Sequence, residues 1–203
     1  MVATASGVAV VTAIADVVDR EFAVVGIDMP MGLPNGELRR CEPEARRYLS
    51  PRGSTIFPTP ARACLAADDY VHACALSFAV AGKKISKQSW AIMSKIAEVD
   101  RAITVQDSER VIEVHPECAF LTMNDGRALP SKHTSEGLGI RAVLIRREFG
   151  PIETRLRGAK PDDVLDAYAA LWSARRFHRG VHMVMPTGEP QFDERGLPMR
   201  III

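Results

Sequence analysis

Acidic residues stand at three places where carboxylates could do chemistry, and the first is Asp28. It directly follows the apolar run FAVVGI at residues 22–27. This run contains β-branched residues and Pro30 comes soon after it, so it predicts a buried parallel strand. Ligands of open α/β sheets collect at the carboxyl ends of strands, where Asp28 would lie. The alternative is that Asp28 turns the chain and accepts hydrogen bonds from nearby backbone N–H groups.

The second place is the segment EVHPE, which runs from Glu113 to Glu117. On a strand over residues 110–115, Glu113 and His115 point to the same face. Burying that face in a central strand is costly unless the two groups are paired or bind a metal. On a half-exposed edge strand, the same face would simply be solvated. We favour a site, because the motif falls at the C-terminal end of the expected strand.

The third place is the start of the last expected helix, with Asp162, Asp163 and Asp166. Asp166 lies one turn after the other two, so one helix face can carry two carboxylates. Acids in a first turn normally complement the helix dipole, which is a sufficient explanation for Asp162 and Asp163. Asp166 lies deeper in an otherwise apolar run and is less easily explained in that way.

Together these acids predict a site for divalent cations, Mg²⁺ or Mn²⁺. Mg²⁺ prefers oxygen ligands and keeps several of its waters. Two such ions about 4 Å apart align a water and stabilise the leaving oxygen in phosphodiester hydrolysis. His115 is the expected proton shuttle, because histidine ordinarily titrates near neutral pH.

The elements that must position these acids alternate between helices and strands. Apolar spacing predicts a helix over residues 8–20, before the first strand. A block of helices follows, in which Asp68 or Asp69 caps a helix that ends at Gly82, and Ser86 caps another to about residue 103. After the second strand come helices near residues 118–123 and 138–149, and Pro161 begins the last one, to about residue 178. This order predicts an α/β domain.

Length and composition are those of an ordinary globular domain. The chain has 203 residues, of which 47% are hydrophobic and 25% are charged, which argues against disorder, collagen and coiled coil. A net charge of +1 gives no general argument for a nucleic-acid partner, although a local groove can still be basic. Four scattered cysteines without a C-x-x-C pair argue against structural zinc. With no charged leader and no long apolar run, we expect a cytoplasmic protein without a membrane partner.

Several short motifs, taken together, resemble a single family. They are GIDMPMGLP, RGSTIFPTPAR, ISKQSWAIMSKIAEVD, EVHPE, SKHTSEG and DDVLDA. In this order they are similar to the predicted RNase H-like nucleases catalogued as domain of unknown function four-two-nine, from about Phe22 to the C-terminus. The resemblance implies one domain over residues 1–203, with an RNase H-like mixed sheet flanked by helices and a helical insertion at about 37–108. It also implies a metal-dependent nuclease, an activity that is itself predicted from the fold.

The resemblance assigns roles to particular residues. Catalytic and metal-binding positions are Asp28, Glu113 and an acid of the last helix, Asp163 or Asp166, with His115 beside them. Substrate contacts fall on Arg52, Ser54, Gln88, Lys95 and Lys132. The basic side chains suit phosphate oxygens and the glutamine suits a hydrogen bond, and the alternative is that they are surface charges.

The N-terminus departs from the family pattern. Members normally begin with a strand and hairpin reading G-V-D-G…G-W, which supplies a first catalytic Asp, and we expect nothing of that kind before the first helix here. The start could be annotated too late, truncated or truly different. A catalytically inactive scaffold or binding protein is therefore the alternative function. An open sheet edge could then favour an oligomer or a partner strand.

Overall fold

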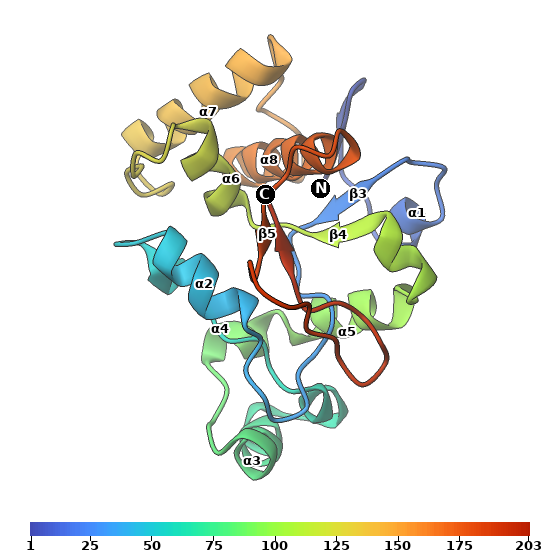
Figure 1. Ribbon diagram of the computed structural model, residues 1–203. Coiled ribbons are helices and arrows are strands. Elements are labelled where there is room, and N and C mark those ends of the chain that lie inside the picture. The colour runs from blue at the N-terminus through green and yellow to red at the C-terminus, as the bar shows by residue number, and fades with distance from the viewer.

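Short strands at the centre of the molecule form a small mixed sheet (Figure 1). The computed structural model describes residues 1–203. Strand β3 (Val25–Ile27) lies parallel to β4 (Val111–Glu113), with Ile27 opposite Glu113. Strand β5 (Val184–Met185) is antiparallel to β6 (Ile201–Ile202), and a single parallel bridge joins Val114 to Ile202. The strands therefore run in the order β3, β4, β6, β5, and the predicted α/β class is confirmed as a mixed fold with little sheet.

The N-terminal segment differs from the prediction. Strands β1 (Val2–Thr4) and β2 (Gly7–Ala9) form an antiparallel hairpin, and helix α1 covers only Ala15–Val18. The helix predicted over residues 8–20 is thus wrong in its first half, and a hairpin does precede the first helix. The valines at its start suit a strand as well as a helix. Gly7, with φ of 141°, allows the turn that pairs them with β1.

Helices α6 (Pro116–Met123), α7 (Ser135–Phe149) and α8 (Pro161–His178) pack together above the strands in Figure 1. Helix α8 has the predicted bounds and contributes buried Val164 and Leu165 to the main core. It approaches β3 closely, because a Cβ on Gly26 would lie 2.8 Å from the carbonyl oxygen of Ala170. Glycine at this position therefore lets the helix that carries Asp166 lie directly against the strand that precedes Asp28.

A helical block separates β3 from β4 in the sequence. It holds α2 (Cys41–Tyr48), α3 (Tyr70–Ala81), α4 (Lys87–Ala91) and α5 (Met93–Ala102), with 3₁₀ turns η1 (Gly53–Thr55), η2 (Arg62–Ala66) and η3 (Gln106–Glu109). The predicted caps of α3 are confirmed, since the Asp69 side chain accepts from the His72 N–H and Gly82 is left-handed. Ser86 caps α4 as expected, but a break at Ile92 divides the predicted single helix into α4 and α5.

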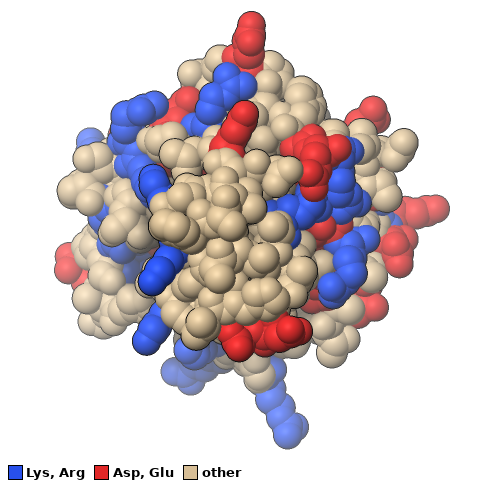
Figure 2. Space-filling view, turned by 90° about the horizontal axis from the view of Figure 1, so that it is seen from below, with Lys and Arg blue, Asp and Glu red and all other residues tan.

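Helix α3 lies at the lower end of the view in Figure 1, so it faces the viewer in Figure 2. The block that contains it is tied to the C-terminal segment by Arg62, which makes ion pairs with Asp100, Asp193 and Glu194. All four cysteines are free and buried. None of the helices combines the length and the apolar character needed to cross a lipid bilayer.

One edge of β3 has no strand partner. Consecutive residues 24–29 on this edge, together with residues 1–6 of the hairpin, line a cavity of about 830 Å³ beside α8. When consecutive residues line a cavity, the backbone edge of a strand faces it, because side chains alternate between the two faces. One edge of β3 therefore faces this cavity, between the hairpin and α8, instead of another strand.

Candidate functional site

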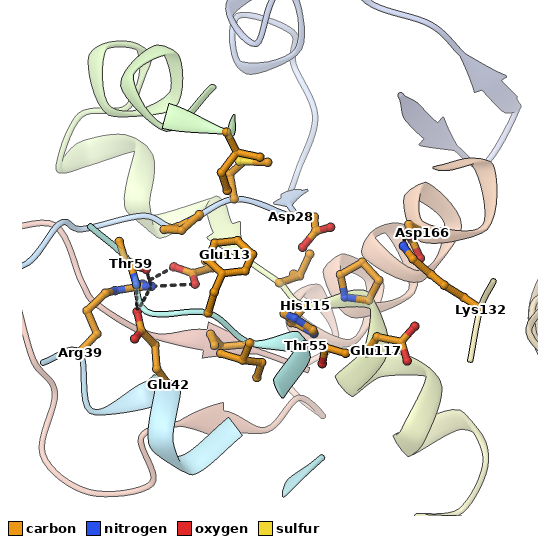
Figure 3. Close-up of a pocket in the computed structure, with 18 residues that line it drawn as sticks. Asp28, Arg39, Glu42, Thr55, Thr59, Glu113, His115, Glu117, Lys132 and Asp166 are labelled. Atoms are coloured by element: carbon orange, nitrogen blue, oxygen red, sulfur yellow. Dashed lines mark hydrogen bonds and ion pairs between the residues drawn. The ribbon is translucent and has the colours of Figure 1, made fainter. Parts of the chain in front are cut away.

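A pocket of about 270 Å³ lies at the carboxyl ends of β3 and β4 (Figure 3). Asp28 follows β3, Glu113 ends β4, and His115 and Glu117 begin the adjoining helix α6. Both strands point their carboxyl ends at the same place because they are parallel. The sequence prediction that these acids come together is confirmed in this respect.

Glu113 is held by a buried arginine that the sequence analysis did not single out. Arg39 Nη1 lies 3.0 Å from Oε1 of Glu113, and Nη2 bonds to Oε2. The backbone N–H of Met31 donates to the same carboxylate at 2.8 Å. Burial by itself would lower the pKa of Arg39, but the Glu113 carboxylate raises this pKa above its ordinary value. The guanidinium therefore stays charged, and both oxygens of Glu113 are engaged within the protein.

The same arginine joins three further segments beneath the pocket. It donates to the Thr59 hydroxyl at 3.0 Å and to the Met31 carbonyl at 2.9 Å. Glu42, on α2, lies 3.6 Å from Arg39 and accepts the Thr59 N–H at 2.9 Å. Arg39 is only 1% exposed, and together with Glu42, Thr59 and Glu113 it lines the inner wall of the pocket.

Glu117 is also neutralised by an arginine. Arg141, on α7, donates through Nε at 3.1 Å and through Nη2 at 2.6 Å to the two oxygens of Glu117. Such a two-point contact between a guanidinium and a carboxylate fixes both groups. Arg141 is fully buried and also donates to the carbonyl oxygens of Pro130 and Gly137.

Asp166 is paired with a lysine from the loop before α7. Lys132 Nζ lies 2.6 Å from Oδ2 of Asp166 and 3.8 Å from Asp162. Burial would lower the pKa of Lys132, but Asp166 raises it above its ordinary value, so the ammonium is charged. The second oxygen of Asp166, Oδ1, is buried without a hydrogen-bond partner. This oxygen remains available for a cation.

Asp28 is the pocket acid that has no basic hydrogen-bond partner. Asp28 is exposed to solvent where the pocket meets the larger cavity beside β3, although protein lies on several sides of the carboxylate. This enclosure, and next the charge of Asp166, raise the pKa of Asp28 from 3.8 to about 7. Ionised Asp28 thus has no ion-pair partner, although the charge of Lys132, which is paired with Asp166, partly offsets the increase in its pKa.

His115 is neutral in this setting. Burial lowers its pKa to about 4, an effect that Lys132 reinforces and Glu117 opposes. Its Nδ1 atom is buried without a hydrogen-bond partner. Near neutral pH this imidazole carries a proton on one nitrogen only. It can therefore form hydrogen bonds or bind a metal ion, but it is not a cationic acid. The sequence predicted His115 as a proton shuttle because histidine ordinarily titrates near neutral pH. In this structure the pKa of His115 is lowered, so that reason does not apply.

The other predicted residues lie outside the pocket. The Asp163 carboxylate accepts the Lys160 N–H at 3.2 Å and so caps α8, with its side chain beside the larger cavity. Arg52 donates to the carbonyl oxygen of Leu129 at 3.0 Å, which is a structural contact. The remaining three are exposed: Ser54 in η1, Gln88 on α4, and Lys95 at the margin of the larger cavity.

A metal ion would find a partly prepared site. The structure contains no group of three or more His, Cys, Asp or Glu side chains arranged to hold a metal ion. The free carboxylate of Asp28 and the unpartnered Oδ1 of Asp166 offer two oxygen ligands. Mg²⁺ is commonly held by one or two carboxylates together with water and substrate phosphate. The residues therefore fit a hydrated cation but not an ion enclosed by protein ligands alone.

Comparison with known proteins gives a family and nothing finer. The family model described as "Protein of unknown function (DUF429)" matches residues 2–191, which is most of the chain. No curated protein and no solved structure matches.

Proposed function

The chain belongs to the DUF429 family, and for it we propose the hydrolysis of phosphodiester bonds with a divalent cation held by Asp28 and Asp166. The observation that carries this proposal is the contrast among the pocket acids. Glu113, Glu117 and Asp166 each have a basic partner, whereas Asp28 has none. An unpaired acid that faces another acid is costly to keep ionised, and a bound cation removes that cost.

We also propose that the strands form the centre of an RNase H-like fold. Two observations support this: β3 and β4 are parallel with acids at their carboxyl ends, and the last long helix, α8, brings Asp166 to the same place.

Four residues of the pocket, Asp28, Asp166, Lys132 and His115, have direct roles in the proposed reaction. A bound Mg²⁺ or Mn²⁺ would lower the pKa of a coordinated water and offset charge on the phosphate. Asp28 and Asp166 would hold the ion through their free oxygens. Lys132, 2.6 Å from Asp166, is close enough to contact a non-bridging phosphate oxygen of the substrate. His115, being neutral, would orient an oxygen of the substrate or water by a hydrogen bond.

Glu113 has a different role in this proposal from the one expected. Both of its oxygens are bonded to Arg39, so it would fix the end of β4 relative to the loop that carries Met31. In this way it would position Asp28 indirectly, without touching the ion. Asp163, which caps α8, would not take part.

The substrate we propose is a nucleic acid or a smaller phosphodiester, in the cytoplasm. The test uses labelled single- and double-stranded DNA and RNA, together with bis(p-nitrophenyl) phosphate, in Mg²⁺ and in Mn²⁺. We expect cleavage by the wild type and by the control Asp163→Asn, and a loss of two orders of magnitude or more in Asp28→Asn and Asp166→Asn. Equal rates in all four proteins would reject the proposed site.

A non-catalytic binding protein is the second candidate, and one contact favours it. The Lys132 ammonium already lies on Oδ2 of Asp166, next to the oxygen proposed to hold the cation. If the ammonium permanently replaces a metal ion, the protein would bind nucleic acid or another partner without cleaving it. Nucleic-acid binding that is unaffected by chelation, with no cleavage of any substrate, would support this candidate.

A further inference from the structure

Helix α3 presents an apolar face to solvent. Val71 is 76% exposed and Phe78 is 60% exposed, and Ala75 lies between them on the same side of the helix. These residues recur at i, i+4 and i+7, which is the spacing of one helical stripe. Gly82, directly after the helix, continues the stripe by one more turn.

The opposite face of α3 is already packed. Ala73, Cys74 and Ser77 are buried, and the first two belong to a small core with Cys64, Ile85 and Met93. No Asp, Glu, Lys or Arg occurs between Tyr70 and Ala81. His72 is the exposed polar side chain of the helix, and the other exposed residues of α3 are apolar. An apolar helix face normally packs against a partner. The exposed stripe of α3 is therefore a surface that lacks its partner in the single chain.

Charge is distributed unevenly at the two ends of this stripe. Asp68 and Asp69 precede the helix, and the Asp68 side chain is 97% exposed. Lys83 and Lys84 follow it and are exposed. Figure 2, which views the molecule from the α3 side, shows a broad area free of charged side chains with charged groups around its margin. The surface thus has an acidic end, an apolar middle and a basic end.

We propose that this face binds a second copy of the same chain, with the two α3 helices antiparallel about a twofold axis. A twofold contact joins the same patch on both copies, so the patch must complement itself. An axis midway between Val71 and Phe78 places Phe78 of each copy against Val71 of the other, with Ala75 near the axis. The small alanine allows the helices to approach closely.

The antiparallel arrangement also satisfies the charges. It brings the acidic end of each helix, at Asp68, to the end of the other helix that is followed by Lys83 and Lys84. The two helix dipoles then oppose one another, which is favourable. A parallel arrangement would place like charges side by side, and a strongly charged partner would find no counterpart in the apolar middle. The chain itself is the partner that matches all three parts.

One helix is a small contact area, so the dimer should dissociate on dilution. Sedimentation velocity over a hundredfold range of protein concentration measures this directly. We expect the wild type to shift from monomer to dimer, and Val71→Glu to remain monomeric throughout. Val143→Glu is the matched control, because Val143 is an exposed valine, 62% exposed, on helix α7. It should behave as the wild type does.

The orientation is tested by reversing charges. Asp68→Lys alone and Lys84→Glu alone should each weaken the dimer, and the double variant should restore it. If the double variant dimerises as the wild type does, Asp68 of one copy must lie near Lys84 of the other, which occurs only when the two helices are antiparallel. A wild type that stays monomeric at every concentration would overturn the proposal. A dimer that Val71→Glu leaves intact, or that Val143→Glu abolishes equally, would overturn it too.

Discussion

Asp28 and Asp166 face the same pocket, but only Asp166 has a basic partner, with Lys132 Nζ 2.6 Å from its Oδ2 atom. The charge of Asp166 contributes to the raised pKa of Asp28, second only to the enclosure of that carboxylate by protein. Lys132 is paired with Asp166, and its charge only partly offsets the rise in the pKa of Asp28. The end of β3 therefore carries a carboxylate without an ion-pair partner.

Removing the charge of Asp28 should stabilise the protein in the absence of metal. Its pKa in the folded state, about 7, is above the ordinary value of 3.8, so ionisation of Asp28 opposes folding. The stability that protonated Asp28 contributes is complete below its ordinary pKa of 3.8. It is lost as the pH rises through the folded-state pKa of about 7. Asparagine imitates the protonated form. We expect Asp28→Asn to gain about 1 kcal/mol at about pH 8, allowing for the water that reaches Asp28.

Chemical denaturation in the presence of a chelator measures this gain. At about pH 3, below the ordinary pKa of 3.8, both folded and unfolded wild type hold the proton for most of the time, so the difference between the two proteins should shrink there. A variant less stable than the wild type at about pH 8 would contradict the account of Asp28 as a carboxylate without an ion-pair partner.

Lys132 should compete with a bound cation. Its ammonium lies on Asp166, so removing it increases the negative potential at the site. We expect Lys132→Met to bind Mn²⁺ roughly tenfold more tightly than the wild type. Under the proposed reaction, the same variant should cleave phosphodiesters more slowly, because a phosphate contact is lost. Lys87→Met, on the exposed surface of α4, is the control and should change neither quantity.

Arg39 should be required for stability rather than for binding a ligand. Replacing it with methionine leaves Glu113 buried without its counter-charge, which costs about 3–5 kcal/mol. The neighbouring exposed Arg40 provides a matched control, and Arg40→Met should change stability by less than about 0.5 kcal/mol. Urea denaturation measures both variants.

A second substitution separates charge from packing at the same place. In the double variant Arg39→Met, Glu113→Leu no charge remains buried, so much of the lost stability should return. If the double variant is no more stable than Arg39→Met alone, the cost arises from the other contacts of Arg39, with Thr59 and Met31.

Cation binding should depend on pH through Asp28. At a pH below its pKa of about 7, a cation must displace a proton from this carboxylate. We therefore expect the apparent affinity for Mn²⁺ to rise between about pH 6 and about pH 8. Calorimetry in buffers of different ionisation enthalpy detects the released proton. Equal affinity at both pH values, with no proton released, would show that Asp28 is not a ligand.

Local signals in the sequence predict the local structure well. The bounds of α8 follow from Pro161 and apolar periodicity, and those of α3 from Asp69 and Gly82. Such signals act within a few residues, so they can be recognised from a single sequence. They are less decisive where propensities are balanced, as in the valines near Val8, which form a strand because they pair with β1.

The site is predictable only in part, for a related reason. The acids at the strand ends are visible as residue types in a pattern, and the structure does bring Asp28, Glu113 and Asp166 to one pocket. Their partners are not visible, because Arg39 lies 74 positions from Glu113 and Arg141 lies 24 positions from Glu117. Tertiary packing decides which acid of the pocket lacks a basic partner. In this structure that acid is Asp28, and the sequence alone does not distinguish it from the others.

A titration with Mn²⁺ determines whether Asp28 is a ligand for a divalent cation. Binding is measured by calorimetry or by the loss of the free Mn²⁺ signal in electron paramagnetic resonance, at about pH 8, where Asp28 is ionised. Asp163→Asn is the matched control, because Asp163 caps α8 outside the pocket. We expect the wild type and Asp163→Asn to bind Mn²⁺ alike, and Asp28→Asn not to bind. Binding by Asp28→Asn with the affinity of the wild type, or no binding by the wild type, would rule out Asp28 as a ligand for the cation.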